Sequence, residues 1–248
     1  MSYFINKQKQ YIAFNKTIGS DPGIIFIHGY NSDMSGEKAK YIEKYAKLKK
    51  ISFVKFDCRG HGKSYGKFED GSISGWTKDT KKIIKRKISK KKLIVVGSSM
   101  GGWIALNLFK EFKKNILAFV GIAPAPEFLD RLMWKKFTNK VKRQLIKDKF
   151  HKFNHGGYEY NISYNLIKDG RKNKIFNKNF SNKIFLTILH GLKDDVVPIS
   201  ISRKILKIFT KAKKKLIIIK QGNHSLSNKG NLKRIRNEIY TIYKQLRP

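Results

Sequence analysis

Short runs of apolar, β-branched residues alternate along the chain with longer stretches in which apolar residues recur every three or four positions. The short runs predict buried strands, and the longer stretches predict helices with one apolar face. Their regular alternation is typical of an α/β fold with a mostly parallel sheet flanked by helices. The predicted strands are Ile24–Ile27, Ser52–Phe56, Leu93–Val96, Leu117–Ile122, Ile184–Leu189 and Leu216–Ile219. The predicted helices are Gly36–Leu48, Gly75–Ile88, Met100–Phe112, Ile199–Phe209 and Asn231–Gln245.

One long segment departs from this alternation. About sixty residues separate the strand that ends near Ala123 from the strand that begins near Ile184, and a structureless loop of that length is rare inside a compact domain. We therefore interpret residues 1–248 as a single domain, with residues 127–182 inserted as a helical cap over the carboxyl edge of the sheet. Within the insertion, Phe128–Phe137 has the apolar spacing of an amphipathic helix.

A hairpin is predicted at the N-terminus. Its two strands are Tyr3–Ile5 and Tyr11–Asn15, and they add antiparallel strands at the edge of the sheet. The first ten residues mix polar and apolar positions and lack the continuous apolar stretch of a signal peptide. The longest apolar runs, such as Ile116–Ala123, are much shorter than the ~20 residues that cross a bilayer. A single cysteine, Cys58, excludes a disulfide framework. We expect a cytoplasmic protein without a membrane span.

The net charge of +38 changes this picture less than its size suggests. Basic surfaces attract nucleic acids and anionic membranes without specificity. Here, however, the lysines are scattered over nearly every segment, and isoleucine, asparagine and lysine are abundant together, as in proteins from AT-rich genomes. No nucleic-acid-binding motif or detached basic tail accompanies the charge. We expect only weak, non-specific binding of polyanions.

The strongest chemical signal is the sequence Gly97-Ser98-Ser99-Met100-Gly101-Gly102, a G-x-S-x-G motif. A predicted buried strand precedes it and an apolar helix follows it, which is the context of a nucleophile elbow. The tight turn requires small neighbours, and the glycines supply them. Such an elbow lifts the Ser99 hydroxyl out of the sheet, and the helix N-terminus favours the negative charge that develops there.

A serine needs a base to take its proton, and an acid to hold that base. In folds with this elbow the chain order is serine, acid, histidine. After the strand 184–189 come two adjacent carboxylates, Asp194 and Asp195, and the one histidine beyond them is His224. The residues therefore indicate a triad of Ser99, His224 and one of the two aspartates.

An oxyanion hole needs two backbone N–H groups that point to the developing charge. One is the N–H of Met100, which follows the nucleophile, and the other is expected from the loop His28-Gly29-Tyr30 after a predicted strand. His28 is interpreted as structural. The turn Asp57–Ser64, which contains Cys58, is interpreted as scaffold. Nothing in the sequence indicates a metal, nucleotide or flavin cofactor.

On these motifs the chain resembles the α/β-hydrolase superfamily over nearly its whole length. It looks most like the branch that contains the mitochondrial palmitoyl-protein thioesterase, which also hydrolyses acyl glucuronides, and its bacterial relatives. The stretches that carry the resemblance are Pro22–Phe26 running into Gly29–Gly36, Gly97–Trp103, Leu189–Pro198 and Tyr160–Lys168. The sequence departs from the branch around His224, where Gly222-Asn223 replaces the usual Ser-Asp pair, and in the cap helix.

The resemblance implies a catalytic triad of Ser99, Asp194 and His224, since in such hydrolases the first aspartate after the strand orients the histidine. It also implies that Tyr30 is the second oxyanion donor. In the cap, an apolar stripe is placed to overhang Ser99, and we expect part of it to bind substrate. The candidate substrate-binding residues are Trp134, Met133 and Phe137.

The resulting hypothesis is a serine hydrolase that cleaves acyl thioesters or carboxylic esters through an acyl-enzyme on Ser99. Its substrate is a small acyl ester or an acylated protein. A general short-chain carboxylesterase is the first alternative, and a peptidase of the same fold is a weaker one because no acidic pocket for a free amino terminus is indicated. The alternative from another class is a non-catalytic, polyanion-binding protein on a hydrolase scaffold.

Overall fold

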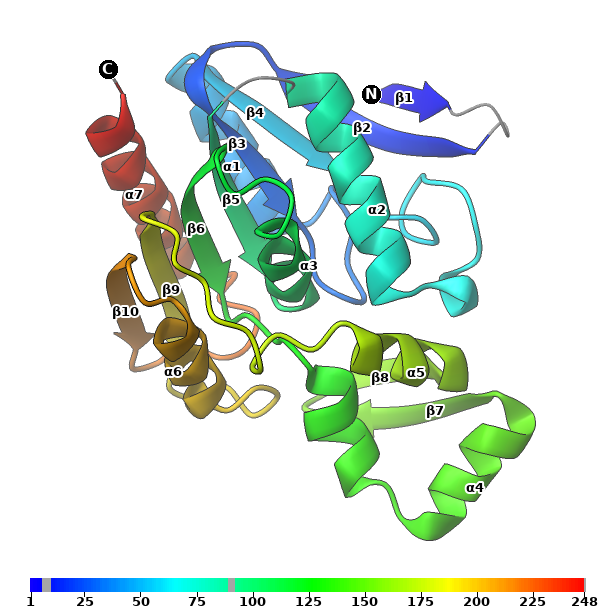
Figure 1. Ribbon diagram of the computed structural model, residues 1–248. Helices are drawn as coiled ribbons and strands as arrows, with labels where there is room; N and C mark the ends of the chain where they lie inside the picture. Colours follow the sequence, from blue (N-terminus) through cyan, green and yellow to red (C-terminus); the bar gives the residue numbers. More distant parts are fainter. Residues whose placement is uncertain (6–9, 89–91, 248) are drawn as a thin grey trace.

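The computed structural model describes residues 1–5, 10–88 and 92–247, so residues 6–9 of the N-terminal stretch lie outside it. Figure 1 shows a central sheet with helices on both faces and a group of elements beyond one end of the strands. The strands are β1 Ser2–Ile5, β2 Tyr11–Thr17, β3 Ser20–Ile27, β4 Ile51–Phe56, β5 Leu93–Ser98, β6 Ile116–Ile122, β7 Phe150–His155, β8 Tyr158–Ser163, β9 Phe185–Gly191 and β10 Lys213–Ile219. The α-helices are α1 Glu37–Leu48, α2 Ile73–Ile83, α3 Met100–Leu108, α4 Asn139–Asp148, α5 Tyr164–Lys172, α6 Ile199–Ile208 and α7 Lys229–Leu246.

The main sheet has eight strands in the order β1-β2-β4-β3-β5-β6-β9-β10. From β4 to β10 all neighbouring strands run parallel, whereas β1 and β2 form an antiparallel hairpin that pairs with β4 at the edge. This confirms the predicted α/β class, the mostly parallel sheet and the N-terminal hairpin. Parallel strands end at the same edge, so the loops after β3, β5, β6, β9 and β10 meet at the carboxyl end of the sheet.

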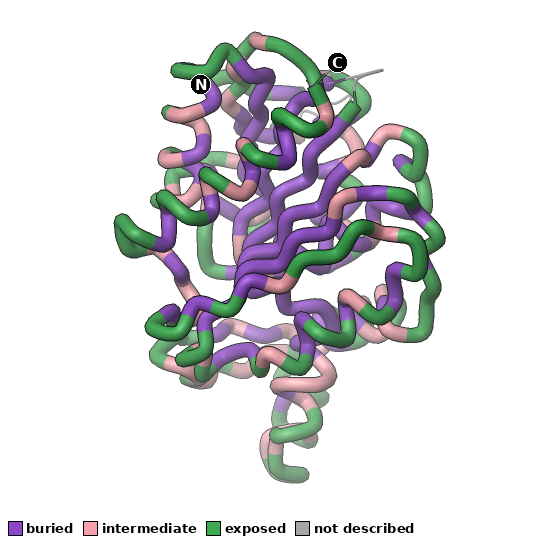
Figure 2. The backbone as a smooth tube through the Cα atoms, turned by 90° about the vertical axis from the view of Figure 1, so that its left-hand side faces the viewer, coloured by how far each residue is buried: buried purple, intermediate pink, exposed green. Residues whose placement is uncertain are grey.

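The strands are buried because each face of the sheet is covered by helices. In β3, Ile25 and Ile27 pack on the face under α2, α3 and α6, while Ile24 and Phe26 face α1 and α7. This period-two alternation divides the apolar core into two layers. Figure 2 shows the buried strands running through the middle of the molecule.

The residues between β6 and β9, here called the insertion, include two α-helices and two strands that the sequence pattern did not predict. The expected helix over residues 128–137 is irregular: a π-helical turn over Leu129–Met133 is followed by a 3-10 turn over Trp134–Lys136. After these turns come α4, the antiparallel hairpin β7–β8 and α5. These elements lie beyond the carboxyl ends of the parallel strands (Figure 1).

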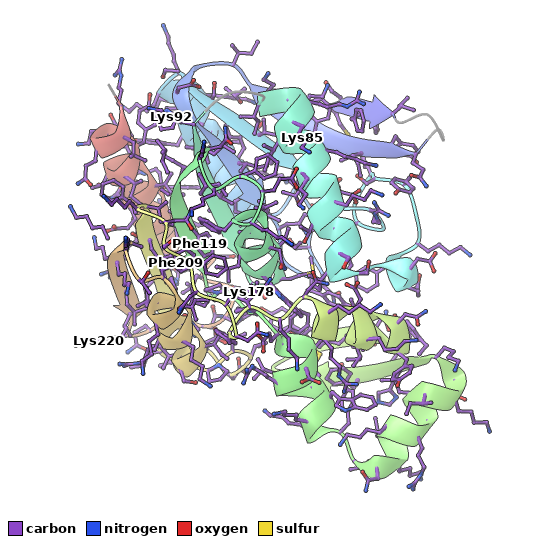
Figure 3. All side chains as sticks on the ribbon, viewed as in Figure 1. Lys85, Lys92, Phe119, Lys178, Phe209 and Lys220 are labelled. Carbon is purple, nitrogen blue, oxygen red and sulfur yellow. The ribbon has the colours of Figure 1, made fainter. Side chains whose placement is uncertain are left out.

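Lysines are spread over the whole outside of the molecule. In Figure 3 the labelled Lys85 and Lys92 lie in the upper part of the view and Lys220 at its lower left, whereas Phe119 and Phe209 are buried between them. The charge therefore does not gather on one element. In the described residues, no helix is both long and apolar enough to cross a membrane.

Candidate active site

Ser99 lies on a strained turn between β5 and α3. Its backbone has φ 51° and ψ −116°, a conformation that non-glycine residues rarely adopt. The turn is possible because Gly97 and Gly101, two positions before and after Ser99, lack side chains. A Cβ on Gly97 would lie 2.5 Å from the carbonyl oxygen of Gly101, and one on Gly101 would collide with the carbonyl oxygen of Ile27. The motif that identified Ser99 thus forms the tight elbow that the sequence predicts.

The structure brings the three predicted triad residues together in one chain of hydrogen bonds. The Ser99 hydroxyl lies 3.0 Å from Nε2 of His224, and Nδ1 of His224 lies 2.9 Å from Oδ2 of Asp194. With the Nδ1–H donating to the carboxylate, Nε2 is free to accept the serine proton. His224 follows β10, Asp194 follows β9 and Ser99 follows β5, so three strand ends supply the three groups.

Asp194 is held as a carboxylate by a set of buried donors. Its side chain is 1% exposed, and Oδ1 accepts hydrogen bonds from the backbone N–H groups of Val196 and Val197 at 3.0 and 2.8 Å. Burial alone would raise the pKa of Asp194, but hydrogen bonds from His190 and His224 outweigh it and hold that pKa well below its usual value. Asp195, the competing carboxylate, is exposed. Within the described residues, no hydrogen bond joins Asp195 to His224.

A second histidine supports Asp194, and the sequence analysis did not single it out. His190 is fully buried, and its Nε2 lies 2.8 Å from the carbonyl oxygen of Val197 and 3.3 Å from Oδ2 of Asp194. Its Nδ1 accepts from the hydroxyl of Ser202 at 2.7 Å, which leaves the Nε2–H to donate. Asp194 Oδ2 therefore has donors on two sides. The signal in the sequence was the position of His190 at the end of the strand that precedes the acid.

The loop after β3 runs against the nucleophile. A Cβ placed on Gly29 would lie 3.5 Å from Cβ of Ser99, so the chain passes Ser99 at van der Waals distance. The next residue is Tyr30, and the first residue of α3 is Met100. Within the described part of the chain, no hydrogen bond is recorded from the N–H of either residue. Tyr30 and Met100 thus both lie close to Ser99, and their role as oxyanion donors stays a prediction.

Buried histidines hold this loop in place. His28 donates from Nδ1 to the carbonyl of Gly29 at 2.7 Å and accepts the N–H of Cys58 at Nε2, and burial lowers the pKa of His28 to about 3. His61 Nε2 donates to the carbonyl oxygen of Tyr30 at 2.5 Å. Both imidazoles act on backbone groups of the loop. The structural role expected of His28 and of the turn that follows β4 agrees with these contacts.

Ser99 borders two cavities of different size and chemistry. The larger measures about 220 Å³ and contains His224 in its wall. Lys38 also lines it and donates to the carbonyl oxygen of Ser225 at 2.5 Å and to the hydroxyl of Ser227 at 3.0 Å. Burial lowers the pKa of Lys38 to about 8, against the opposing effect of Glu37. Other polar residues in this wall are Asn31, Ser32, Asp33 and Tyr158.

The smaller cavity measures about 20 Å³, and its wall does not include His224. Apart from Tyr30, Tyr160 and Ser99, its wall is made of apolar side chains. These are Ala125, Phe128, Leu132, Met133, Val196 and Val197.

Of the three candidate substrate-binding residues, Met133 reaches the smaller cavity. Trp134 packs instead against Tyr164, with ring centroids 5.9 Å apart, and under the guanidinium of Arg171. Phe137 packs against Phe153 in the hairpin at 5.0 Å. Trp134 and Phe137 do not line either of these two cavities, and their part in substrate binding stays a prediction.

The described residues contain no group of three or more His, Cys, Asp or Glu side chains arranged to hold a metal ion. At Ser99 the structure combines a hydroxyl group, an imidazole hydrogen-bonded to it and a carboxylate hydrogen-bonded to that imidazole.

The fold and this site define an α/β hydrolase. A family model described as "Serine aminopeptidase, S33" matches residues 20–150. Palmitoyl-protein thioesterase ABHD10, mitochondrial, from Homo sapiens is 30% identical over 237 residues, which cover 93% of this chain and 75% of that protein. The chain thus belongs to this family of α/β hydrolases, and its predicted similarity to the thioesterase branch is confirmed.

Solved structures agree with this assignment. Alpha/beta hydrolase domain-containing protein 10 from mouse superimposes with a TM-score of 0.90 at 26% identity, over 99% of this chain and 98% of the other. Est1E from Butyrivibrio proteoclasticus, solved with ferulic acid, gives a TM-score of 0.78 at 18% identity, over 98% of this chain and 99% of the other. The second likeness concerns the fold alone.

Proposed function

We propose that the protein is a serine hydrolase that cleaves acyl esters or thioesters through an acyl-enzyme on Ser99. The observation that carries this proposal is the unbroken hydrogen-bonded chain from Ser99 through His224 to the buried Asp194. A serine hydroxyl becomes a useful nucleophile when such a base takes its proton during attack. A degenerate hydrolase scaffold that only binds ligands would have no need of this arrangement.

In the proposed reaction, Oγ of Ser99 attacks the acyl carbonyl carbon while its proton passes to Nε2 of His224. The N–H groups of Tyr30 and Met100 donate to the oxyanion, and Asp194 stabilises the imidazolium. The tetrahedral intermediate collapses when the leaving oxygen or sulfur takes the proton from His224. Water then attacks the acyl-enzyme, gives a proton to His224, and releases the carboxylic acid with the Ser99 hydroxyl restored.

The substrate class rests on the relatives. One is named a palmitoyl-protein thioesterase, which supports acyl esters or thioesters as substrates here. The description of the family model names an aminopeptidase, so hydrolysis of an amide substrate should be measured alongside hydrolysis of esters and thioesters. We propose that esters and thioesters are cleaved faster than leucine p-nitroanilide. The cytoplasmic localisation expected from the sequence stays a proposal.

A fluorophosphonate probe tests the nucleophile directly. We expect the probe to label the wild-type protein on Ser99, and Ser99→Ala to abolish labelling and to reduce turnover on the order of 10³-fold or more. Ser98→Ala is the matched control, because Ser98 is the neighbouring hydroxyl and has no hydrogen bond to His224 recorded in the described residues. Labelling that persists in Ser99→Ala, or that disappears in Ser98→Ala alone, would contradict the proposal.

A further inference from the structure

The loop that carries His224 contains a strained residue. Leu226, two positions after His224, has a φ of 48°, a conformation that non-glycine residues rarely adopt. Its side chain is fully buried in the same apolar layer as residues of β10 and α7. A Cβ on Gly222 would lie 2.6 Å from Cδ2 of Leu226, so this packing requires the glycine. A backbone conformation of this kind persists only where the surrounding groups hold it.

Two side chains hold the peptide group that joins Ser225 to Leu226. At one end of the group, the N–H of Leu226 donates to Oδ1 of Asn223 at 3.2 Å. At the other end, the carbonyl oxygen of Ser225 accepts a hydrogen bond from Nζ of Lys38 at 2.5 Å. The orientation of the peptide group next to the strained residue is therefore fixed from both sides.

Lys38 reaches this loop from a distant part of the chain. It is the second residue of α1 and lies 187 positions before Ser225 in the sequence. Its Nζ also donates to Oγ of Ser227 at 3.0 Å. Hydrogen bonds from an ammonium group to a neutral oxygen are charge-assisted, and they are stronger than bonds between two neutral groups. Lys38 thus ties α1 to the loop at two points.

We propose that Lys38 is a positioning residue for His224. It holds the loop after β10 so that the imidazole keeps its two hydrogen bonds, to Ser99 and to Asp194. This inference deepens the proposed function and rests on it. Lys38 acts through the backbone of the loop, and a displacement of the base by about 1 Å costs on the order of 10²-fold in rate.

Position and charge predict opposite effects when Lys38 is changed. Lys38 and His224 line the same cavity, and a positive charge near an imidazole disfavours its protonated form. Removing the charge alone would favour the imidazolium that forms during the reaction, so it would raise the rate. Loss of the hydrogen bonds that hold the loop lowers the rate. The sign of the change therefore separates the two effects.

Lys38→Met keeps the length of the side chain and removes its donors. At pH 7 we expect kcat for p-nitrophenyl acetate to fall about tenfold or more, with KM within about twofold of the wild-type value. The rate of fluorophosphonate labelling should fall by a similar factor. Lys40→Met is the matched control, because Lys40 is exposed on the same helix, and it should leave kcat unchanged.

The outcomes of this experiment are distinguishable. Wild-type protein that the probe does not label refutes the proposed function. If the wild type is labelled and Lys38→Met keeps its kcat, this inference alone is refuted. A change confined to KM would place Lys38 in substrate binding and would also overturn the proposal. Melting temperatures are measured alongside, so that kcat is compared between folded proteins.

Chemical rescue keeps the proposal testable if Lys38→Met folds poorly. Aminoethylation of Lys38→Cys with 2-bromoethylamine creates a side chain of the same length that ends in an ammonium group. We expect it to restore kcat to within about threefold of the wild type, whereas iodoethane, which adds the same two carbons without the nitrogen, should not. The natural cysteine, Cys58, is buried, and treated wild-type protein controls for its modification. Equal kcat after the two reagents, with complete alkylation, would overturn the proposal.

The partner at the other end of the peptide group provides an independent measurement. Asn223 is exposed, so Asn223→Ala should change stability little, and we expect kcat to fall about threefold or more. Since Asn223 and Lys38 hold one peptide group, the loss in the double variant should be smaller than the product of the two single losses. Losses that multiply would show that the two side chains act independently, and would contradict the proposed action of Lys38 through this group.

Discussion

The edge of the sheet and the insertion that faces it are built in different ways. At the sheet edge, Ser99 lies on a strained turn with a positive φ. Asp194 is held by buried hydrogen bonds, and its side chain is 1% exposed. In the insertion, the residues over the site belong to short turns of changing pitch, and α4 buries one residue, Leu145. Figure 2 shows the same contrast between the buried strands and the exposed outer part of the insertion.

We therefore expect the sheet edge to carry the catalytic groups and the insertion to determine which substrate binds. The three predicted triad residues follow buried strand ends, and the residues predicted to choose a substrate lie on the insertion. Substitutions at the sheet edge should therefore change the rate of the reaction itself. Substitutions in the insertion should change stability or substrate choice and leave the nucleophile reactive.

Among the substitutions that compare these two regions, the largest effect is expected when Asp194 is changed. Asp194→Asn removes the negative charge that holds the His224 imidazole, so we expect kcat/KM to fall at least about tenfold further than in Asp195→Asn. Asp195 is the matched control, because it is the adjacent carboxylate and is exposed. Steady-state kinetics on p-nitrophenyl acetate measure the difference. If Asp195→Asn loses as much activity as Asp194→Asn, the acid has been assigned to the wrong residue.

The same carboxylate should link the sheet edge to acid stability. Since the pKa of Asp194 is lower in the folded protein than the ~3.9 of an unfolded chain, its ionised form stabilises the fold at neutral pH. That contribution is complete above the unfolded pKa and is lost as pH falls through the folded one. We expect Asp194→Asn to lower the melting temperature at neutral pH, and the gap to the wild type to shrink below about pH 4. A difference in melting temperature that stays constant from neutral to acid pH would contradict a stabilising role of the ionised Asp194 carboxylate.

A smaller effect is expected at the base of the insertion. Glu127 is 4% exposed, and its carboxylate accepts the N–H groups of Ile175 and Phe176, both at 2.8 Å, and pairs with Arg131. It joins the start of the insertion to its end. Glu127→Gln keeps the shape but loses the charge, so we expect a loss of about 1–2 kcal/mol in the free energy of unfolding.

Fluorophosphonate labelling of Ser99 should persist in Glu127→Gln at temperatures where the variant is folded. Loss of labelling in the folded variant would show that the insertion governs the nucleophile as well, and would remove the separation between the two regions. Asp130→Asn is a suitable control, because Asp130 pairs with Arg171 at the surface of the same segment.

The smallest effect is expected from the surface charge. The lysines are distributed over both regions, so binding of double-stranded DNA should weaken steeply between low and physiological salt and show no sequence preference. Turnover of a neutral ester should change little over the same range. Tight, sequence-selective binding at physiological salt would favour the polyanion-binding alternative.

The sheet edge could be predicted from the sequence because its signals are local. The G-x-S-x-G motif with a strand before it fixes Ser99, and the order of serine, acid and histidine selects His224. The support that His190 gives to Asp194 was not predicted. Its contact depends on how the loop after β9 folds back, which is a tertiary feature.

The insertion was harder to predict because its elements depend on packing between them. A constant helical pitch over residues 128–137 would place Met133, Trp134 and Phe137 on one stripe. The change from π to 3-10 winding after Met133 turns the later side chains toward Tyr164 and Phe153. The hairpin β7–β8 has short strands with mixed residues, and its stacking of Phe153 on Tyr160 is invisible in a pattern of apolar positions.

One contact between the two regions has a consequence for redesign. The Tyr30 hydroxyl donates to the carbonyl oxygen of Asn161 in β8 at 2.5 Å, and its ring stacks on Tyr160. Tyr30, the proposed second oxyanion donor, is thus attached through its side chain to the insertion. If the cap of another hydrolase were grafted onto this sheet, the grafted cap would have to supply a hydrogen-bond acceptor for the Tyr30 hydroxyl and an aromatic ring that stacks on Tyr30. We expect such a graft to need compatible partners for Tyr30 as well as a cap of suitable shape.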